Sequence, residues 1–304
     1  MPHCPVCDSS RQHHYLAVDG YQIVQCRRCR YLFVSQPPSD AELAAFYQEP
    51  GYYKGSAYGY TDYFALRPIH EKLARTRLRR IERLRQARGR ILDVGCAAGF
   101  FLKVAQDRGW DVHGVELSED MAAYTERLTG ASVASRVTAL DAEPASFDAI
   151  TCWEYIEHIP EPRVEVQRLV RLLKPGGVLA LSTPNTRCWE AVHQPERWRE
   201  FKPPAHIGFF TAATLRWMLS SCGLEVVALP RSQPRAPAHP YAAQRLLGLL
   251  RETVGNGAER RTPFWWIFSL AWRLSERATQ AAYALRWPDS DIQVCAEAYA
   301  RKPF

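Results

Sequence analysis

The chain has 304 residues, of which 47% are hydrophobic and 23% charged, and its formal net charge is +7. This composition is ordinary for a globular protein and allows one substantial core with a small accessory module. No uncharged apolar run approaches the roughly 20 residues that cross a bilayer. The amino-terminal segment lacks a basic and apolar signal sequence, so we expect a cytoplasmic protein. Nine cysteines, partly in CxxC pairs, favour metal binding over a disulfide framework.

The first predicted module, residues 1–36, is a zinc ribbon. Its metal ligands would be the two CxxC pairs: Cys4, Cys7, Cys26 and Cys29. Four thiolates can surround Zn²⁺ tetrahedrally and leave no open position, which predicts a structural zinc. So short a segment cannot bury enough apolar surface to fold alone, and metal binding should supply its folding free energy. Glycine commonly follows the second cysteine of such pairs, but Asp8 and Arg30 stand there, and arginine tolerates a left-handed backbone less well than aspartate.

Residues 37–89 are predicted to form a connector. Ser39 and the residues after it are typical of a helix cap and a short helix. Residues 51–63 are rich in tyrosine and glycine, and this loop could fold over a ligand, with Tyr63 as a candidate catalytic residue, or pack on the surface. An amphipathic helix is predicted over 66–84. Its basic face could bind RNA phosphates or anionic lipid, although a solvated face is the commoner explanation.

The central region, residues 90–232, alternates short apolar runs with helical stretches, which indicates an α/β fold with a parallel sheet. The predicted strands are 90–94, 111–116, 132–138, 147–153, 177–183 and 224–230. In such sheets ligands bind at the carboxyl ends of the strands. Residues that directly follow these strands are therefore the candidates for a binding site.

A glycine turn follows the first of these strands. Gly95, Ala97 and Gly99 are small enough for the backbone to approach a ligand. Glu116 closes the next strand, where an acid can bind ribose hydroxyls, and Asp93 precedes the turn. The two acids together would repel a diphosphate, whereas they would attract the ammonium group of S-adenosylmethionine (SAM). The pattern predicts a SAM pocket rather than a dinucleotide pocket.

Three segments in this order resemble those of class I SAM-dependent methyltransferases, in the branch near the ubiquinone-biosynthesis O-methyltransferases: Ile91–Leu102, Ser146–Pro162 and Arg171–Asn185. The resemblance implies a Rossmann-like, seven-stranded sheet with helices on both faces. It also implies that Asp93, Gly95 and Gly99 line the methionine end of SAM and that Glu116 holds the ribose. Ala97 stands where the family pattern, Asp-x-Gly-x-Gly-x-Gly, has its middle glycine.

Three further residues are counted with the SAM site. By the same resemblance, Asp141 is the acid on the adenine side. Leu117 directly follows Glu116, and Trp153 ends the fourth strand, where its ring could pack on adenine or on the substrate.

The resemblance extends beyond the core. The ribbon, the tyrosine-rich connector and the segment Pro203–Thr211 together resemble the sugar C-methyltransferases of deoxysugar pathways. In those enzymes the histidine that matches His206 follows a glutamate and is implicated as the base. Ala205 stands in place of that glutamate, which departs from the sugar-enzyme pattern.

Methyl transfer requires an aligned nucleophile and a group that removes its proton, because the sulfonium of SAM already activates the methyl group. A histidine with a near-neutral pKa suits this role, and no metal is needed for the step. His206 is our first candidate, with capping of the helix near Thr211 as its alternative role. His158 is the second candidate. It ranks below His206 because the Glu-His pair to which it belongs is often a structural hallmark in this family.

The carboxyl-terminal part is predicted to carry a helical insertion, residues 233–290, before a last antiparallel strand within 291–304. The helices of the insertion are expected at 241–254 and 264–286. Residues 264–274 are unusually aromatic and could contact a membrane surface, form a lid or a dimer face, or pack on the protein's own core.

Together these features predict a SAM-dependent methyltransferase that acts on oxygen or carbon of a small-molecule acceptor, such as a sugar, a nucleotide-sugar or a secondary metabolite. An RNA methyltransferase is the first alternative, because of the zinc ribbon and the positive net charge. Against it, the basic residues cluster on one helix, and no Asn-Pro-Pro-Tyr motif follows the fourth strand. A non-catalytic scaffold that binds SAM is the second alternative.

Overall fold

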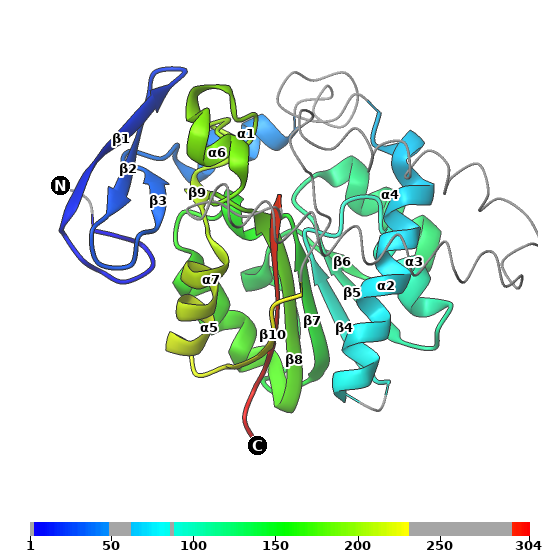
Figure 1. Cartoon of the computed structure of the whole chain (residues 1–304). Helices are drawn as coiled ribbons and strands as arrows, with labels where there is room; N and C mark the ends of the chain where they lie inside the picture. The colour runs from blue at the N-terminus through cyan, green and yellow to red at the C-terminus, as the bar shows by residue number, and fades with distance from the viewer. Residues whose placement is uncertain (1–2, 49–61, 86–87, 231–293) are drawn as a thin grey trace, which may run out of the picture. The chain divides into compact units, whose positions relative to one another are not determined.

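The computed structural model describes residues 3–48, 62–85, 88–230 and 294–304 (Figure 1). The chain forms two compact units, and the larger contains Met1–Asn185, Arg199–Arg231 and Cys295–Phe304. The described part of the smaller unit holds the short helix α6 (Trp189–His193), in which the Trp189 and His193 rings lie 5.3 Å apart. The expected helices at 241–254 and 264–286 lie outside the described residues. Among the described helices, none has the length and apolar character needed to cross a membrane.

A seven-stranded sheet forms the centre of the larger unit, in the order β10-β11-β8-β7-β4-β5-β6. Its strands are β4 (Arg90–Val94), β5 (Asp111–Val115), β6 (Val133–Ala134), β7 (Phe147–Trp153), β8 (Leu173–Pro184), β10 (Glu225–Ala228) and β11 (Cys295–Arg301). The neighbours from β8 to β6 pair in parallel, whereas β11 is antiparallel to both β8 and β10. The predicted α/β fold with an antiparallel last strand is confirmed.

Helices cover both faces of this sheet (Figure 1). They are α2 (Arg67–Arg85), α3 (Phe100–Gln106), α4 (Glu119–Thr129), α5 (Pro162–Leu172) and α7 (Ala212–Ser221). Successive residues of a strand point to opposite faces. Ile91 accordingly packs in a core cluster with Leu78 of α2, while Leu92 packs in a second cluster with Leu169 of α5 and Leu215 of α7. Burial on both faces explains why the strands read as continuous apolar runs.

The strand expected at 132–138 is shorter than predicted. Within this stretch only Val133 and Ala134, which form β6, pair with β5, and Val137–Ala139 form a 3-10 turn instead. Ser135 and Arg136 between them are exposed, so this edge of the sheet buries little apolar surface. The strand expected at 177–183 is longer than predicted, because β8 continues through the preceding turn from Leu173.

The amino-terminal module is a second sheet, in the order β1-β2-β3-β9. Its strands are β1 (Gln12–Val18), β2 (Tyr21–Cys26), β3 (Leu32–Val34) and β9 (Gly208–Phe209). The fourth strand, β9, comes from a distant part of the chain and begins two residues after His206. Tyr31 is 1% exposed, and its ring lies 4.7 Å from that of Phe210. The ribbon and the segment around His206 are thus one packed structure.

A short helix, α1 (Asp40–Gln48), links the ribbon to the connector. Ser39 accepts a hydrogen bond from the Glu42 amide at 3.3 Å, and Glu42 accepts one from the Ser39 amide at 2.8 Å. This reciprocal capping box confirms the predicted helix start.

Candidate functional site

The turn after β4 has a left-handed backbone at three positions. The φ angles of Gly95, Ala97 and Gly99 are 75°, 45° and 69°. A Cβ atom on Gly95 would lie 2.9 Å from the Tyr155 ring, and one on Gly99 would lie 2.7 Å from the Thr125 methyl group. Both positions therefore need glycine for space as well as for conformation. Ala97 adopts the left-handed conformation despite its side chain.

Two buried carboxylates flank this turn. Glu116 is 7% exposed and accepts hydrogen bonds from the amides of Ala97, at 2.8 Å, and Ser118, at 2.9 Å. Asp93 is 2% exposed and accepts a hydrogen bond of 2.6 Å from the Thr151 hydroxyl. Burial raises the pKa of Asp93 to about 7, against the lowering effects of Thr151 and Arg77. The structure thus brings Asp93, the turn and Glu116 together, in an arrangement that favours a cationic ligand.

Tyr63 reaches the same region from the connector. It is 8% exposed, and its ring stacks on that of Phe100, the first residue of α3, with centroids 5.6 Å apart. Burial raises the pKa of Tyr63, and the charges of Asp93 and Glu116 raise it further. Its phenol therefore remains protonated and can donate a hydrogen bond, but it is not a base at neutral pH.

The other three residues assigned to the SAM site lie in different surroundings. The Leu117 carbonyl accepts a hydrogen bond of 3.0 Å from the Gln48 side chain at the end of α1. Asp141 is exposed and makes no hydrogen bond or ion pair within the described ranges. The Trp153 ring packs beneath α2, with the Arg77 guanidinium carbon 3.9 Å from its centroid. The structure therefore places Trp153 in the core between α2 and the sheet.

The two candidate bases, His158 and His206, are neighbours, with ring centroids 4.8 Å apart. His158 Nδ1 donates to the Ala205 carbonyl at 2.6 Å, and the Tyr47 hydroxyl lies 2.6 Å from the same nitrogen. His206 Nδ1 donates to the Glu200 carbonyl at 3.0 Å. These assignments leave the Nε2 atom of each ring as the acceptor. Burial lowers the pKa of His158 to about 4 and that of His206 well below its usual value, so both rings are neutral.

Glu157 completes this cluster. Its side chain is 1% exposed, and a carboxylate oxygen and one nitrogen of each histidine all lie within 4.8 Å of one another. The Thr183 hydroxyl is close enough to lower the pKa of Glu157, yet neither carboxylate oxygen has a hydrogen-bond partner of ordinary geometry within the described ranges. Burial and the charge of Glu154 raise that pKa well above the usual range. Two imidazoles and a carboxylate can share protons or hold a divalent cation.

From the sequence, Glu157 was noted only as the partner of His158 in the Glu-His pair, and Tyr47 was not singled out. Tyr47 lies in α1, and its contact with His158 spans 111 residues of the chain, which no local pattern reveals.

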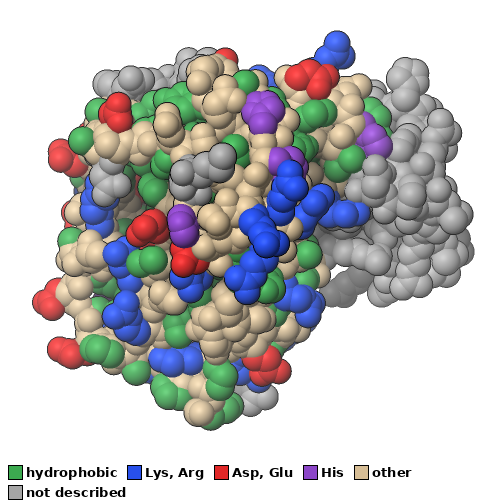
Figure 2. Space-filling model, turned by 90° about the vertical axis from the view of Figure 1, so that its left-hand side faces the viewer, with side chains coloured by type: hydrophobic (Ala, Val, Ile, Leu, Met, Phe, Trp, Pro, Cys, Tyr) green, Lys and Arg blue, Asp and Glu red, His purple; other side chains and the backbone are tan. Residues whose placement is uncertain are grey.

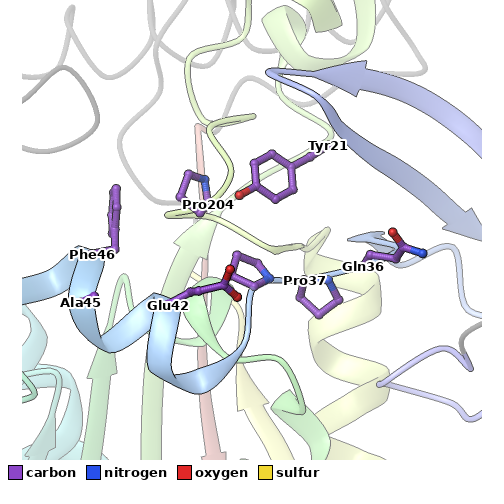
Figure 3. A pocket seen from close by; sticks show the side chains of 8 residues that line it. Tyr21, Gln36, Pro37, Glu42, Ala45, Phe46 and Pro204 are labelled. Carbon is purple, nitrogen blue, oxygen red and sulfur yellow. The ribbon is translucent and has the colours of Figure 1, made fainter.

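A hollow of about 450 Å³ lies beside the loop that carries His206. Its walls come from the ribbon hairpin, α1 and that loop: Tyr21, Gln36, Pro37, Pro38, Glu42, Ala45, Phe46 and Pro204. In Figure 3 the Tyr21 side chain extends toward Pro204, two residues before His206. Proline, alanine and aromatic residues supply most of the lining, and Gln36, Glu42 and the Tyr21 hydroxyl add polar groups, a mixture that occurs in small-molecule sites.

The four ribbon cysteines form one compact cluster. The Sγ atoms of Cys4 and Cys29 are 3.6 Å apart, those of Cys7 and Cys26 are 3.5 Å apart, and all four lie within 4.8 Å of one another. A tetrahedron with Zn–S bonds of about 2.3 Å has sulfur–sulfur edges of about 3.8 Å, so the cluster has the right size for zinc. The residue after each pair is left-handed, with φ of 60° at Asp8 and 65° at Arg30.

Comparisons with known proteins agree with this arrangement. Residues 66–229, just over half of the chain, match the family described as "Methyltransferase domain". The chain therefore belongs to the class I SAM-dependent methyltransferases.

It is 31% identical over 153 residues to the ubiquinone biosynthesis O-methyltransferase of Idiomarina loihiensis, a match that covers 46% of this chain and 63% of the relative. A match to the protein of that name from Methylococcus capsulatus is 39% identical over 101 residues and covers 31% and 43%. The chain thus spans less than two thirds of these curated relatives.

Solved structures share the fold. A chain from the complex of the Haloferax volcanii Trm112 methyltransferase activator with a methyltransferase aligns with a TM-score of 0.52 and 16% identity, over 86% of this chain and 98% of that one. Phosphoethanolamine N-methyltransferase 2 of Haemonchus contortus, solved with SAM, aligns with a TM-score of 0.55 and 19% identity, over 90% and 62%.

Proposed function

We propose that this protein transfers the methyl group of SAM to oxygen or carbon of a small-molecule acceptor. The observation that carries the proposal is the left-handed turn between two buried carboxylates, Asp93 and Glu116. Asp93 would attract the cationic methionine end of the cofactor, and Glu116 would bind its ribose. Bound SAM supplies a methyl group that its sulfonium already activates, so the chain needs to orient the acceptor and take its proton.

His206 is the base in this proposal. The bond from Nδ1 to the Glu200 carbonyl fixes the tautomer that leaves Nε2 as the proton acceptor. Burial keeps the imidazole neutral, but it lowers the pKa well below the near-neutral value expected from the sequence, so the free-protein ring is a weaker base than predicted. His158 and Tyr47 hold the neighbouring Ala205 carbonyl, through donors at 2.6 and 3.1 Å.

Two observations support a small acceptor. The hollow beside the His206 loop has the size and lining of a small-molecule site. The basic residues that suggested RNA, on α2 and just after it, are largely engaged in ion pairs with the protein itself. On α2 these are Arg75 with Glu71, Arg77 and Arg80 with Glu297, and Arg85 with Asp148; beyond the helix, Arg88 pairs with Glu82. The relatives named as O-methyltransferases make oxygen the first acceptor atom to test.

The ribbon cysteines are proposed to hold a structural Zn²⁺, because their spacing fits a closed tetrahedral site. A cytoplasmic location stays a prediction. The proposed membrane contact of residues 264–274 lies outside the described residues and also stays a prediction.

The test incubates the purified protein with methyl-labelled SAM and an extract of its source, and then separates polar metabolites, lipids, RNA and protein. We expect label among the polar metabolites, and a loss of about a hundredfold or more in the rate with His206→Asn. His14→Asn, an exposed position in β1, serves as the matched control. Label in RNA would overturn the acceptor class. SAM binding without label in any fraction would establish the scaffold alternative, and an unchanged rate in His206→Asn would remove His206 as the base.

A further inference from the structure

A second pocket, lined by three arginines, lies on the zinc ribbon, apart from the residues assigned to methyl transfer. Its volume is about 680 Å³, and we call it the ribbon pocket. Its lining residues are Ser9, Ser10, Arg11, Gln12, Arg27 and Arg28. Every one of them carries a side-chain hydrogen-bond donor, and three carry a permanent positive charge. What distinguishes it from the hollow beside the His206 loop is its charge, because the charged residue in the lining of that hollow is Glu42.

The cysteine cluster brings these residues together. Arg27 and Arg28 stand between Cys26 and Cys29, so the metal-binding knuckle fixes their backbone. The Arg27 amide donates to the Arg11 carbonyl at 2.9 Å, which joins the knuckle to the start of β1. The Arg11 amide in turn donates to the Ser9 hydroxyl oxygen at 3.2 Å, and that hydroxyl keeps its proton for another acceptor. The pocket is therefore built on a rigid backbone rather than on a free loop.

The three arginines of the ribbon pocket differ from those of α2 in their ion pairing. Within the described ranges none of their guanidinium groups forms an ion pair, whereas most arginines of α2 do. Figure 2, which views the side of the molecule at the left of Figure 1, shows Lys and Arg side chains gathered in one area. All three arginines are exposed, so an anionic ligand in the pocket could reach their positive charges.

We propose that the ribbon pocket binds the phosphoryl group of a small phosphorylated ligand. Guanidinium forks match phosphate oxygens in pairs, and hydroxyl and amide donors can satisfy the remaining oxygens. Three positive charges suit a multiply charged phosphate better than a single carboxylate. The pocket volume is that of a small-ligand site, and its arginines are confined to two turns rather than extended along a track for an RNA backbone. This assignment does not depend on the proposed methyl transfer.

The experiment is calorimetric titration of the full-length, zinc-loaded protein with inorganic pyrophosphate and, separately, with a single-stranded RNA oligonucleotide. Pyrophosphate should bind, and the double variant Arg27→Gln, Arg28→Gln should weaken binding by about tenfold or more. The matched control is Arg79→Gln, Arg83→Gln on the exposed face of α2, which removes the same charge and should change the affinity less than about twofold.

Zinc content and circular dichroism check that the ribbon of each variant is folded. Arg11→Gln, which lies outside the cysteine pairs, provides an independent variant that should also weaken binding. The proposal is overturned if pyrophosphate does not bind, or if the α2 control weakens binding as much as the pocket variants. Tighter binding of RNA than of pyrophosphate through the same arginines would also overturn it.

Discussion

Asp93 is the residue whose charge depends most on what occupies the site. Burial raises its pKa to about 7, and the charge of Glu116 adds to the rise. Without ligand the folded protein therefore holds a proton that the unfolded chain would release near its ordinary pKa of 3.8. Between these two values the folded state binds more protons, so its stability falls as the pH rises. A cationic ligand reverses this preference, because it favours the ionised carboxylate.

SAM binding should accordingly strengthen as the pH rises toward 7. With a pKa near 7 in the free protein, the ionised fraction of Asp93 grows roughly fivefold between pH 6 and pH 7, and the Kd should fall by a similar factor. Calorimetry in buffers of different ionisation enthalpy should also detect proton release on binding. Asp93→Asn should bind weakly and with little pH dependence, while Asp120→Asn, at an exposed position, should behave as the wild type. A Kd independent of pH in the wild type would contradict the role given to Asp93.

Local chemistry explains which site residues the sequence revealed. Gly95, Gly99 and Glu116 follow from strand-turn-helix spacing, because the small residues and the acid lie close together in the chain. Tyr47 was missed, and the approach of Glu157 to His206 was not predicted, because both depend on contacts made across the fold. Trp153 ends its strand as predicted, but its half-buried ring packs under Arg77 of α2, a contact across the fold that the sequence does not reveal.

Among the elements, the buried strands were predicted to within a few residues, since burial on both faces leaves an unbroken apolar run. The length of the edge strand β6 was overestimated, because the residues after Ala134 are exposed and do not continue the strand. Strand β9 could not be predicted, because Gly208 and Phe209 form a strand only through their pairing with Phe33 and Leu32. A Cβ on Gly208 would collide with the Tyr31 hydroxyl, so this glycine permits the close contact of ribbon and core.

The ribbon also supports the segment that carries His206. The Val34 amide donates to the Ile207 carbonyl at 2.9 Å, and the Ile207 amide donates to the Glu157 carbonyl at 3.0 Å. Strand β3 is thus hydrogen-bonded to the residue next to His206. Folding of the ribbon, which we attribute to zinc, should therefore order the proposed base. The SAM-binding turn at Gly95 follows β4 of the other sheet, so it should not depend on the ribbon.

Loss of the metal should consequently reduce the rate of methyl transfer without weakening SAM binding. Cys26→Ser should lower the zinc content of the protein and reduce kcat by about tenfold or more, because β3 no longer holds the His206 segment. The Kd for SAM should change little. Cys222→Ser removes a half-buried thiol outside the cluster and should leave zinc content and kcat unchanged. Full activity in a zinc-free variant would show that the ribbon does not position the base.

For the molecule as a whole, the positive net charge is a poor guide to its partners, because many arginines hold the fold together. Arg77 is 9% exposed, and its Nε lies 3.3 Å from Glu297 of β11, a residue 220 positions away. Its Nη2 donates to the Ser182 hydroxyl at 2.9 Å, and its guanidinium covers Trp153. One side chain of the connector thereby joins α2 to three strands of the sheet.

Removing this side chain should destabilise the protein instead of changing its affinity for nucleic acid. Arg77→Met leaves Glu297 buried with one fewer positive partner, and loss of one member of a buried ion pair lowers the free energy of unfolding by about 3 kcal/mol. Arg80 and the Tyr299 hydroxyl still contact Glu297, which keeps the loss below that of an isolated charge. Arg79→Met, on the exposed face of the same helix, should lower the free energy of unfolding by less than about 0.5 kcal/mol.

Urea unfolding followed by circular dichroism measures the free energy of unfolding of both variants. Equal stability of the two variants would mean that the Arg77 pair does not tie the connector to the sheet, and the RNA interpretation of this helix would then need to be reopened.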